Sequence, residues 1–440
     1  MTASLTAPPS GADDRPRAVT RSWASRWPVP LWFVARYGAT VLAGAVMLAT
    51  ELTAMAQRGM QWRGDLVWTI DWLPVSFVLV APVVAGLSAL DTARMATGAG
   101  HLAHGPFFRT PAFAVVATYS VLAVLTHCLV LAVALVVSAP QTWDPAAPLA
   151  VLVQLLMLVV FAALGGAAGR FARPKVAGSV GALSAFALMY VAGGPDQGLA
   201  LFEFGGATVP RVGFAYDAGH LAWQAVALAA VAAALVVLRP VEGPRGRRPD
   251  PRDAAFSVVL LTLVAALVST VDSDRLRVVG AAPTVCGEVE GVTTCFYAQH
   301  RRIEKDFQQA LFVLASSARD QGYDALVPTE VDEAAPGSLP QDQDPEVAAF
   351  YVMPDHLQGA SPTLWDVASG IVQPVHCPQV RGDDPPSDRY WKDLDALVGT
   401  WVGLADPSEV AMRAPDARTL GPAEAATIAE GFRTCTYPNF

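Results

Sequence analysis

Long apolar stretches dominate the first 271 residues of the chain. Seven of them approach the roughly 20 residues that a helix, rising about 1.5 Å per residue, needs to cross a bilayer. They cover residues 33–54, 69–90, 112–137, 149–168, 176–193, 221–238 and 254–271. One such stretch alone fits a buried helix of a soluble protein. Seven in succession, separated by short polar loops, predict a polytopic α-helical membrane protein with about seven spans.

A different pattern begins after the last apolar stretch. Strand-like segments lie around 284–297 and 347–353, and helical periodicity appears over 301–322, 388–404 and 421–432. The first helix is predicted to bury Ile303, Phe307, Ala310, Leu311 and Leu314 and to stop at Gly322. The second is predicted to place Trp391, Leu394, Val398 and Trp401 on one face. Residues 275–440 therefore predict one α+β domain of about 165 residues, enough for its own core.

The charge distribution divides the chain at the same point. Residues 1–274 hold 18 Lys and Arg against 15 Asp and Glu, whereas residues 275–440 hold 12 against 24. An almost neutral apolar part is thus joined to an acidic, water-soluble part. The acidic surplus gives no indication of nucleic acid as a partner.

The loops between the apolar stretches predict an orientation. Alternate loops, with the N-terminal leader, carry 14 positive side chains: Arg15, Arg17, Arg21, Arg26, Arg94, Arg109, Arg170, Arg173, Lys175, Arg239, Arg245, Arg247, Arg248 and Arg252. The intervening loops carry only Arg58, Arg63 and Arg211. Positive loops face the cytoplasm. The N-terminus is therefore predicted inside, and an odd number of spans places the C-terminal domain outside the cytoplasm.

These patterns divide the chain into five parts. They are a cytoplasmic leader with an interfacial helix (1–32), a six-span bundle (33–238), a basic cytoplasmic loop (239–253), a seventh span (254–271) and the extracytoplasmic domain (275–440). A cleavable signal peptide is the alternative for the N-terminus, because AMAQ at 54–57 resembles a cleavage site. The leader and the apolar run are both too long for that interpretation.

Four of the five cysteines lie in the acidic domain. Outside the cytoplasm such thiols oxidise, and proximity in sequence favours the pairs Cys286–Cys295 and Cys377–Cys435. Zinc is the alternative, but the spacing lacks the paired C-x₂₋₄-C of structural zinc sites. Cys128, in the third span, is predicted to be an inert apolar side chain.

Signatures of catalysis are missing from the sequence. It contains no P-loop, GxGxxG, HExxH, GxSxG or kinase motif, so we expect neither an enzyme nor a bound cofactor. His300 and Glu304 lie one helical turn apart and could hold a metal with His356 or His376. The preferred interpretation is an ordinary polar pair on a helix surface.

Within the apolar half, His127 is the most deeply placed ionisable residue and the candidate intramembrane site. The preferred interpretation is a neutral histidine hydrogen-bonded within the bundle. Glu51, Asp71 and Asp272 lie near the predicted span ends, where we expect water to reach them. In the fifth span Ala177, Gly181 and Ala185 recur every four residues, which predicts close approach of another helix.

Three segments around the first six spans share a layout with a known family. The leader at 17–32 mixes arginines with tryptophans, the loop 91–112 begins at Asp91 and ends in Arg109-Thr110-Pro111, and a long segment, 193–220, separates the fifth and sixth spans. Over residues 17–240 this layout resembles the membrane subunits of six-span ABC exporters. The seventh span and the disulfide-bearing domain depart from that family.

The resemblance implies a partner. A separate ABC ATPase would dock on the loop 91–112 through Phe107 and Phe108, with Asp91 and Arg109 fixing the ends of the loop, and the subunit would act in the bilayer as a homodimer or heterodimer. The expected function is then a permease-like transport subunit. The alternative is a non-transporting sensor or scaffold whose external domain binds a ligand or partner. Twenty-seven arginines against three lysines resemble a high-GC actinobacterial composition.

Overall fold

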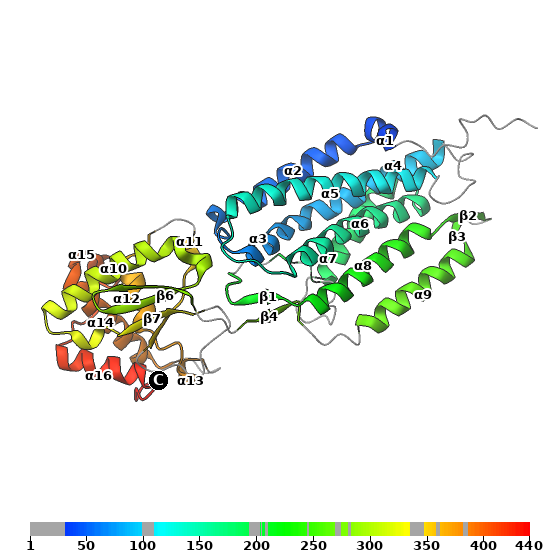
Figure 1. The fold of residues 1–440 in the computed structure, drawn as a ribbon. Coiled ribbons are helices and arrows are strands. Elements are labelled where there is room, and N and C mark those ends of the chain that lie inside the picture. The colour runs from blue at the N-terminus through cyan, green and yellow to red at the C-terminus, as the bar shows by residue number, and fades with distance from the viewer. Residues whose placement is uncertain are drawn as a thin grey trace, which may run out of the picture.

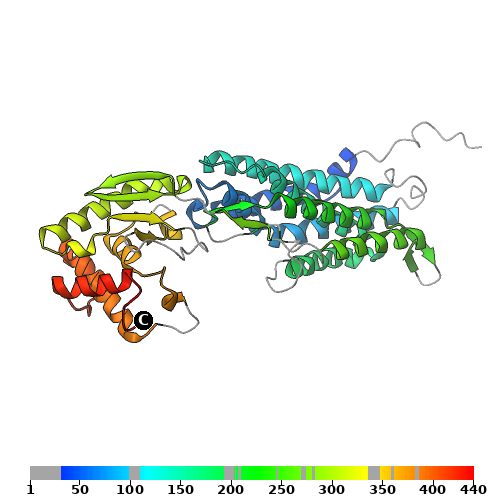
Figure 2. The ribbon, with the colours of Figure 1, turned by 60° about the horizontal axis from the view of Figure 1, so that its bottom comes forward.

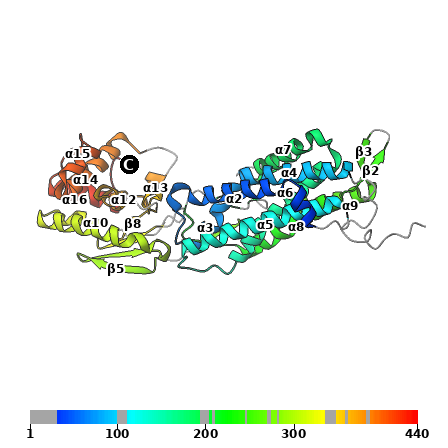
Figure 3. The same ribbon diagram turned by 90° about the horizontal axis from the view of Figure 1, so that it is seen from above.

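The chain folds into a bundle of long helices followed by a mixed α/β domain, and the two parts lie end to end (Figures 1 and 3). The computed structural model describes residues 31–98, 110–192, 203, 205–206, 210–243, 246–268, 274–279, 283–334, 347–357, 361–381 and 386–440. We call the end of the bundle that faces the C-terminal domain the proximal end, and the opposite end the distal end.

The bundle consists of nine helices among the described residues. They are α1 (Leu31–Tyr37), α2 (Thr40–Ala56), α3 (Leu66–Trp72), α4 (Phe77–Gly98), α5 (Pro111–Ser138), α6 (Ala147–Phe171), α7 (Pro174–Ala192), α8 (Ala218–Val237) and α9 (Pro251–Val268). Five helical stretches are long and apolar enough to cross a membrane: Thr40–Met60, Leu66–Met95, Pro111–Ser138, Ala147–Phe171 and Ala218–Val237. They confirm several helices that are long and apolar enough to span a membrane, which is consistent with a membrane protein. Helices α7 and α9 cover the two other predicted spans.

Side-chain caps fix where these helices begin. Thr110 accepts a hydrogen bond from the Phe113 amide at 3.2 Å, and Pro111 follows it in the first turn of α5. Asp65 caps α3 in the same way, and Asp217 caps α8. Each cap accepts a hydrogen bond from an amide that has no partner within the helix. The capping residues in the loops therefore determine where the helices begin.

The second apolar stretch is broken between α3 and α4. A short 3₁₀ turn (Leu73–Ser76) joins the two helices and contains Pro74. Proline has no amide hydrogen, so the carbonyl of Ile70, four residues earlier, loses its normal helical donor. The break therefore leaves a free backbone acceptor inside the bundle.

Small residues allow α4 to pack closely against α6 and α7. A methyl group added at Gly165 would lie 2.2 Å from the Ala85 carbonyl oxygen, and one at Gly181 would lie 2.6 Å from the same oxygen. Ala177 and Ala185 are fully buried beside Gly181. The predicted close approach along the fifth apolar stretch is confirmed.

The outer faces of the bundle are apolar. Large exposed aliphatic and aromatic side chains lie on α2, α5, α7 and α9, among them Leu42, Leu52, Leu125, Leu129, Val136, Leu183, Phe186, Phe256, Val258 and Leu263. Exposed apolar surface of this extent on helices fits contact with lipid.

The predicted basic loop at 239–253 contains a hairpin. Strands β2 (Pro240–Gly243) and β3 (Gly246–Pro249) pair antiparallel at the distal end of the bundle (Figure 1). Arg239 binds Asp253 at 2.8 Å beside the hairpin, at the start of α9. Arg170 donates to the last carbonyls of α8, at Val236 and Leu238. Arginines therefore hold the turn between α8 and α9.

The C-terminal domain is built on a four-stranded sheet in the order β5-β6-β7-β8. Strands β5 (Val285–Val289) and β6 (Val292–Phe296) form a hairpin, and β7 (Glu330–Glu333) and β8 (Val347–Phe350) continue the sheet in parallel. The helices are α10 (Arg301–Asp320), α11 (Pro354–Leu357), α12 (Leu364–Val372), α13 (Pro378–Arg381), α14 (Asp388–Ala405), α15 (Pro407–Arg413) and α16 (Pro422–Arg433). The predicted combination of helices and a sheet in the C-terminal region is confirmed.

Helix α10 supplies the core of this domain. Phe307 lies with its ring centroid 5.2 Å from that of Phe296 on β6 and 4.4 Å from that of Phe350 on β8. All five apolar residues predicted for its inner face are buried. In α14 the prediction for Trp391 is wrong, because this side chain is 44% exposed and Tyr390 is buried instead.

Both predicted disulfides are present. Cys286 and Cys295 face each other across the β5–β6 hairpin, and their sulfurs are bonded. Cys377 and Cys435 join the segment before α13 to the turn after α16. Cys128 remains a free thiol.

Candidate functional site

His127 lies in a fully buried polar cluster between three helices. Its Nδ1 is 3.2 Å from Glu51 Oε1 on α2, and its Nε2 is 3.1 Å from Gln154 Oε1 on α6. The three side chains are 0% exposed. We call Glu51, His127 and Gln154 the polar triad. The Phe77 ring covers the imidazole, with a centroid distance of 5.3 Å.

The helix break positions the triad. Gln154 Nε2 donates to the Ile70 carbonyl at 2.9 Å, the same carbonyl that Pro74 deprives of its helical donor. The amide of Gln154 is thereby oriented with its oxygen toward His127. The Ile70 carbonyl on α3, the Gln154 amide on α6, the His127 imidazole on α5 and the Glu51 carboxyl group on α2 thus form one continuous chain of polar contacts.

The expected access of water to Glu51 and Asp71 is wrong. Both are 0% exposed, because helix packing encloses Glu51 beside His127, and Asp71 is enclosed beside Tyr216 and Arg275. An ionisable residue among apolar neighbours needs a polar partner. That requirement was the available signal that Glu51 and His127 pair. Asp272 lies outside the described residues.

Asp71 belongs to a second buried cluster, at the proximal end. Arg275 donates from Nη2 to Asp71 Oδ1 at 2.6 Å and from Nη1 to Oδ2 at 2.9 Å. The Tyr216 hydroxyl donates to Asp71 Oδ1 at 2.7 Å, and the Arg275 guanidinium lies 5.2 Å from the Tyr216 ring centroid. We call Asp71, Tyr216 and Arg275 the clamp.

Charge and backbone pairing both stabilise the clamp. Burial of Tyr216, reinforced by the Asp71 carboxylate, raises the pKa of its hydroxyl well above the usual value. Burial opposes the charge on Arg275, but Asp71 outweighs it and raises the pKa of the guanidinium. Strand β1 (Phe214–Tyr216) pairs antiparallel with β4 (Leu276–Val278), directly after Arg275 (Figure 2). The segment that leads into the C-terminal domain is therefore fixed to the bundle.

A third set of contacts joins the domain to the bundle directly. Arg302, at the start of α10, donates to the carbonyls of Arg63 and Gln61, the latter at 2.8 Å. Burial, followed by the nearby Arg63 charge, lowers the pKa of Arg302 to about 10. Gln299 Nε2 donates to Thr142 Oγ1 at 3.1 Å. A cavity of about 190 Å³ lies at this junction, lined by residues of both parts.

His300 does not form the predicted pair with Glu304. It is buried, its Nδ1 contacts Glu333 Oε1, and the Tyr297 amide donates to Glu333 Oε2 at 2.9 Å. Glu304 instead accepts from Gln308 at 3.3 Å. His300 precedes α10 rather than lying within it, so helical spacing from His300 does not apply.

Metal binding has little support among the described residues. The two groups of potential ligands are His376 with Cys377 and Cys435, and Cys295 with Glu330 and Asp332. In the first group the two cysteines are bonded to each other, and in the second group Cys295 is bonded to Cys286. A disulfide sulfur is not the thiolate that a metal requires. Neither group therefore forms a metal site while the disulfides persist.

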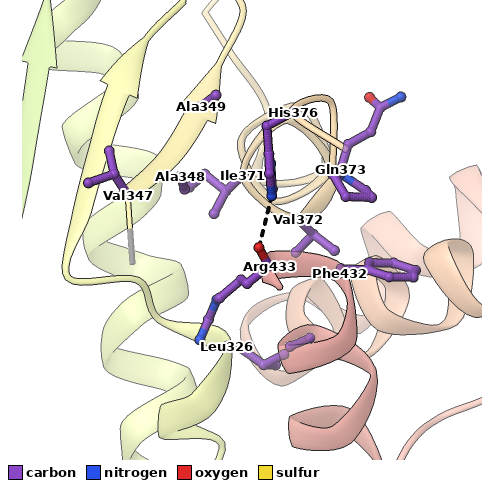
Figure 4. Close-up of a pocket in the computed structure, with 12 residues that line it drawn as sticks. Leu326, Val347, Ala348, Ala349, Ile371, Val372, Gln373, His376, Phe432 and Arg433 are labelled. Carbon is purple, nitrogen blue, oxygen red and sulfur yellow. Dashed lines mark hydrogen bonds between the residues drawn. The ribbon is translucent and has the colours of Figure 1, made fainter. Parts of the chain in front are cut away.

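The C-terminal domain also contains a small cavity beside the second disulfide (Figure 4). His376 Nε2 lies 2.9 Å from the Arg433 carbonyl oxygen, and Leu326, Ile371 and Phe432 supply apolar walls. The volume is about 30 Å³, which is the space of one or two water molecules. This cavity is too small for a ligand.

Asp91 connects three helices at the distal end. It lies within α4, is 3% exposed, and accepts hydrogen bonds from the Ala39 amide at 2.8 Å and the Tyr119 hydroxyl at 2.7 Å. These contacts tie α4 to the start of α2 and to α5. The predicted start of the loop at Asp91 is wrong, because α4 continues to Gly98 and Asp91 lies inside this helix. Phe107, Phe108 and Arg109, like the leader at 17–30, lie outside the described residues.

Comparison of the chain with protein-family models, with curated proteins and with solved structures finds no significant match.

Proposed function

We propose that this protein is a permease-like membrane subunit that crosses the bilayer seven times and is driven by a separate cytoplasmic ATPase. In this proposal α7 and α9 complete the seven spans, the N-terminus is cytoplasmic, and the C-terminal domain lies outside the cytoplasm. The arginine-rich hairpin β2–β3 at the distal end, opposite the acidic domain, supports this orientation (Figure 1).

The single observation that carries the proposal is the anchoring of Asp91. A subunit without its own nucleotide site needs a firm contact through which force from an ATPase reaches the spans. Asp91 provides one, because its carboxylate, in the last part of α4, accepts from the Ala39 amide before α2 and from Tyr119 in the first part of α5. Movement of the loop 91–112 would be transmitted to three helices together.

The test is the retention of a partner. When the full chain is purified from its own cells in mild detergent, an ABC ATPase should co-purify with it. Replacing Phe107 and Phe108 with alanine should release that ATPase, at a cost of about 2–4 kcal/mol of binding free energy if both rings are hot spots. The matched control is Phe312→Ala, which removes an exposed ring from α10 in the C-terminal domain. Full retention by the double variant contradicts the proposed contact.

The clamp favours a second candidate function, a sensor or scaffold. A buried bidentate ion pair joins Arg275, directly before β4, to Asp71 on α3. Binding of a ligand or partner to the C-terminal domain would therefore alter the packing of the bundle. Absence of any co-purifying ATPase, together with a ligand or cell-envelope partner bound to the C-terminal domain, would favour this function over transport.

A further inference from the structure

The polar triad determines where hydrogen atoms must lie. Gln154 presents its amide nitrogen to the Ile70 carbonyl, so its oxygen faces His127 Nε2. An amide oxygen only accepts, and His127 Nε2 must therefore carry a hydrogen. One hydrogen must also lie between His127 Nδ1 and Glu51 Oε1, since two bare acceptors do not hold a contact of 3.2 Å.

That hydrogen has two possible positions. On Nδ1 it makes an imidazolium beside a carboxylate, and on Oε1 it makes a neutral imidazole beside a carboxylic acid. Both forms carry no net charge. They differ in what they leave unsatisfied, because Glu51 Oε2 is buried and has no hydrogen-bond partner among the described residues.

Burial decides between the two forms. A carboxylate would leave a charged oxygen without a donor in an apolar interior, which is costly. A carboxylic acid leaves only a carbonyl-type oxygen there, and its hydroxyl donates to Nδ1. The neutral form is therefore the more stable one in the closed bundle.

Neighbouring charges do not reverse this choice. Among the described residues of the helices packed around the pair, α5 contributes the thiol of Cys128 and the hydroxyl of Tyr119, which is bonded to Asp91 on α4. On α3, Asp71 is neutralised by Arg275. On α6, Arg170 binds the carbonyls that end α8.

We propose that Glu51 and His127 form a proton-binding site within the bundle, with the proton held on Glu51 Oε1 and hydrogen-bonded to a neutral His127. A rearrangement that separated α2 from α5 would break this bond and admit water, and the acid would then ionise: the O–H bond is lost, its electron pair stays on Oε1, and water accepts the proton. Rearrangement of the bundle is thus linked to one proton. This inference goes beyond the proposed function and holds whether or not an ATPase drives the chain.

Infrared spectroscopy of the full chain in mild detergent tests the position of the proton. At neutral pH the wild-type spectrum should contain the carbonyl band of a protonated carboxyl group that shifts in D₂O, and Glu51→Gln should weaken it. Gln154→Glu is not a suitable control, because it adds an acid to the triad. Asp416→Asn, which alters an exposed carboxylate, should leave the band unchanged. Equal intensity in wild type and Glu51→Gln overturns the proposal.

Nitrogen NMR on histidine-labelled protein gives an independent measurement that leaves the triad intact. The chain has seven histidines, and replacing the other six one at a time by glutamine assigns the His127 signals by elimination. We expect hydrogen on Nε2 and none on Nδ1. Hydrogen on both nitrogens at neutral pH would establish the ion pair and refute the neutral site, even if Glu51→Gln failed to fold.

Discussion

At the scale of single residues, the buried carboxylate of Asp71 depends on Arg275. Replacing Arg275 with alanine leaves a charge without its partner inside the protein, and we expect a loss of about 3–5 kcal/mol in the free energy of unfolding. The control is Arg277→Ala, two positions further along the chain in β4, where the residue is exposed. Thermal unfolding of the full chain in detergent compares the two. Equal melting temperatures for the two variants would contradict the structural role of the clamp.

Asp332 should make the stability of the C-terminal domain dependent on pH. Burial, followed by the Glu330 charge, raises the pKa of Asp332 from 3.8 to about 6 in the folded state. An acid whose pKa is raised by folding is stabilised in its protonated form. Its contribution to the free energy of unfolding is therefore present below about pH 4 and is lost as the pH rises through about 6. Asp332→Asn should reduce the change of melting temperature with pH over this window. Asp416→Asn, at an exposed position, should keep the slope of the wild type.

At the scale of elements, the sequence predicts helices and their buried faces more successfully than it predicts individual side-chain contacts. Apolar runs and helical periodicity predicted the long helices and the inner face of α10, because burial imposes that spacing locally. The break at Pro74 was not predicted, since the apolar run continues through it. The partners Asp71 and Arg275 are 204 positions apart, and no local pattern relates them. The pair Glu51–His127 was missed because the two residues are 76 positions apart and no local pattern relates them.

Helix packing in the bundle makes a further prediction about Gly165. A methyl group at this position would lie 2.2 Å from the Ala85 carbonyl oxygen, so Gly165→Ala must push α6 away from α4. Overpacking of this kind costs about 1–3 kcal/mol. Gly178→Ala is the matched control, because its methyl group would meet the Gly86 carbonyl oxygen at 3.4 Å, an ordinary contact. A melting temperature no lower for Gly165→Ala than for Gly178→Ala would show that the close approach of α4 and α6 is not rigid.

At the scale of the whole molecule, three buried polar clusters follow the axis of the bundle. Asp91 joins helices at the distal end, the polar triad joins them in the middle, and the clamp joins them to the C-terminal domain at the proximal end. Each cluster connects segments far apart in the chain. Because an unpaired buried polar group is costly, these clusters favour one arrangement of the helices over others that would pack equally well.

The orientation of the whole chain is the last prediction, and the disulfides allow it to be tested on intact cells. If the proximal end faces outward, a membrane-impermeant alkylating reagent should reach Cys286, Cys295, Cys377 and Cys435 only after external reduction. Cys128 should stay unlabelled, because α5 places it inside the bundle region. A reporter enzyme that works only outside the cytoplasm should likewise be active when fused after Phe440. Labelling that requires permeabilised cells, or cytoplasmic activity of the fusion, would reverse the orientation and separate the disulfides from the oxidising compartment that explains them.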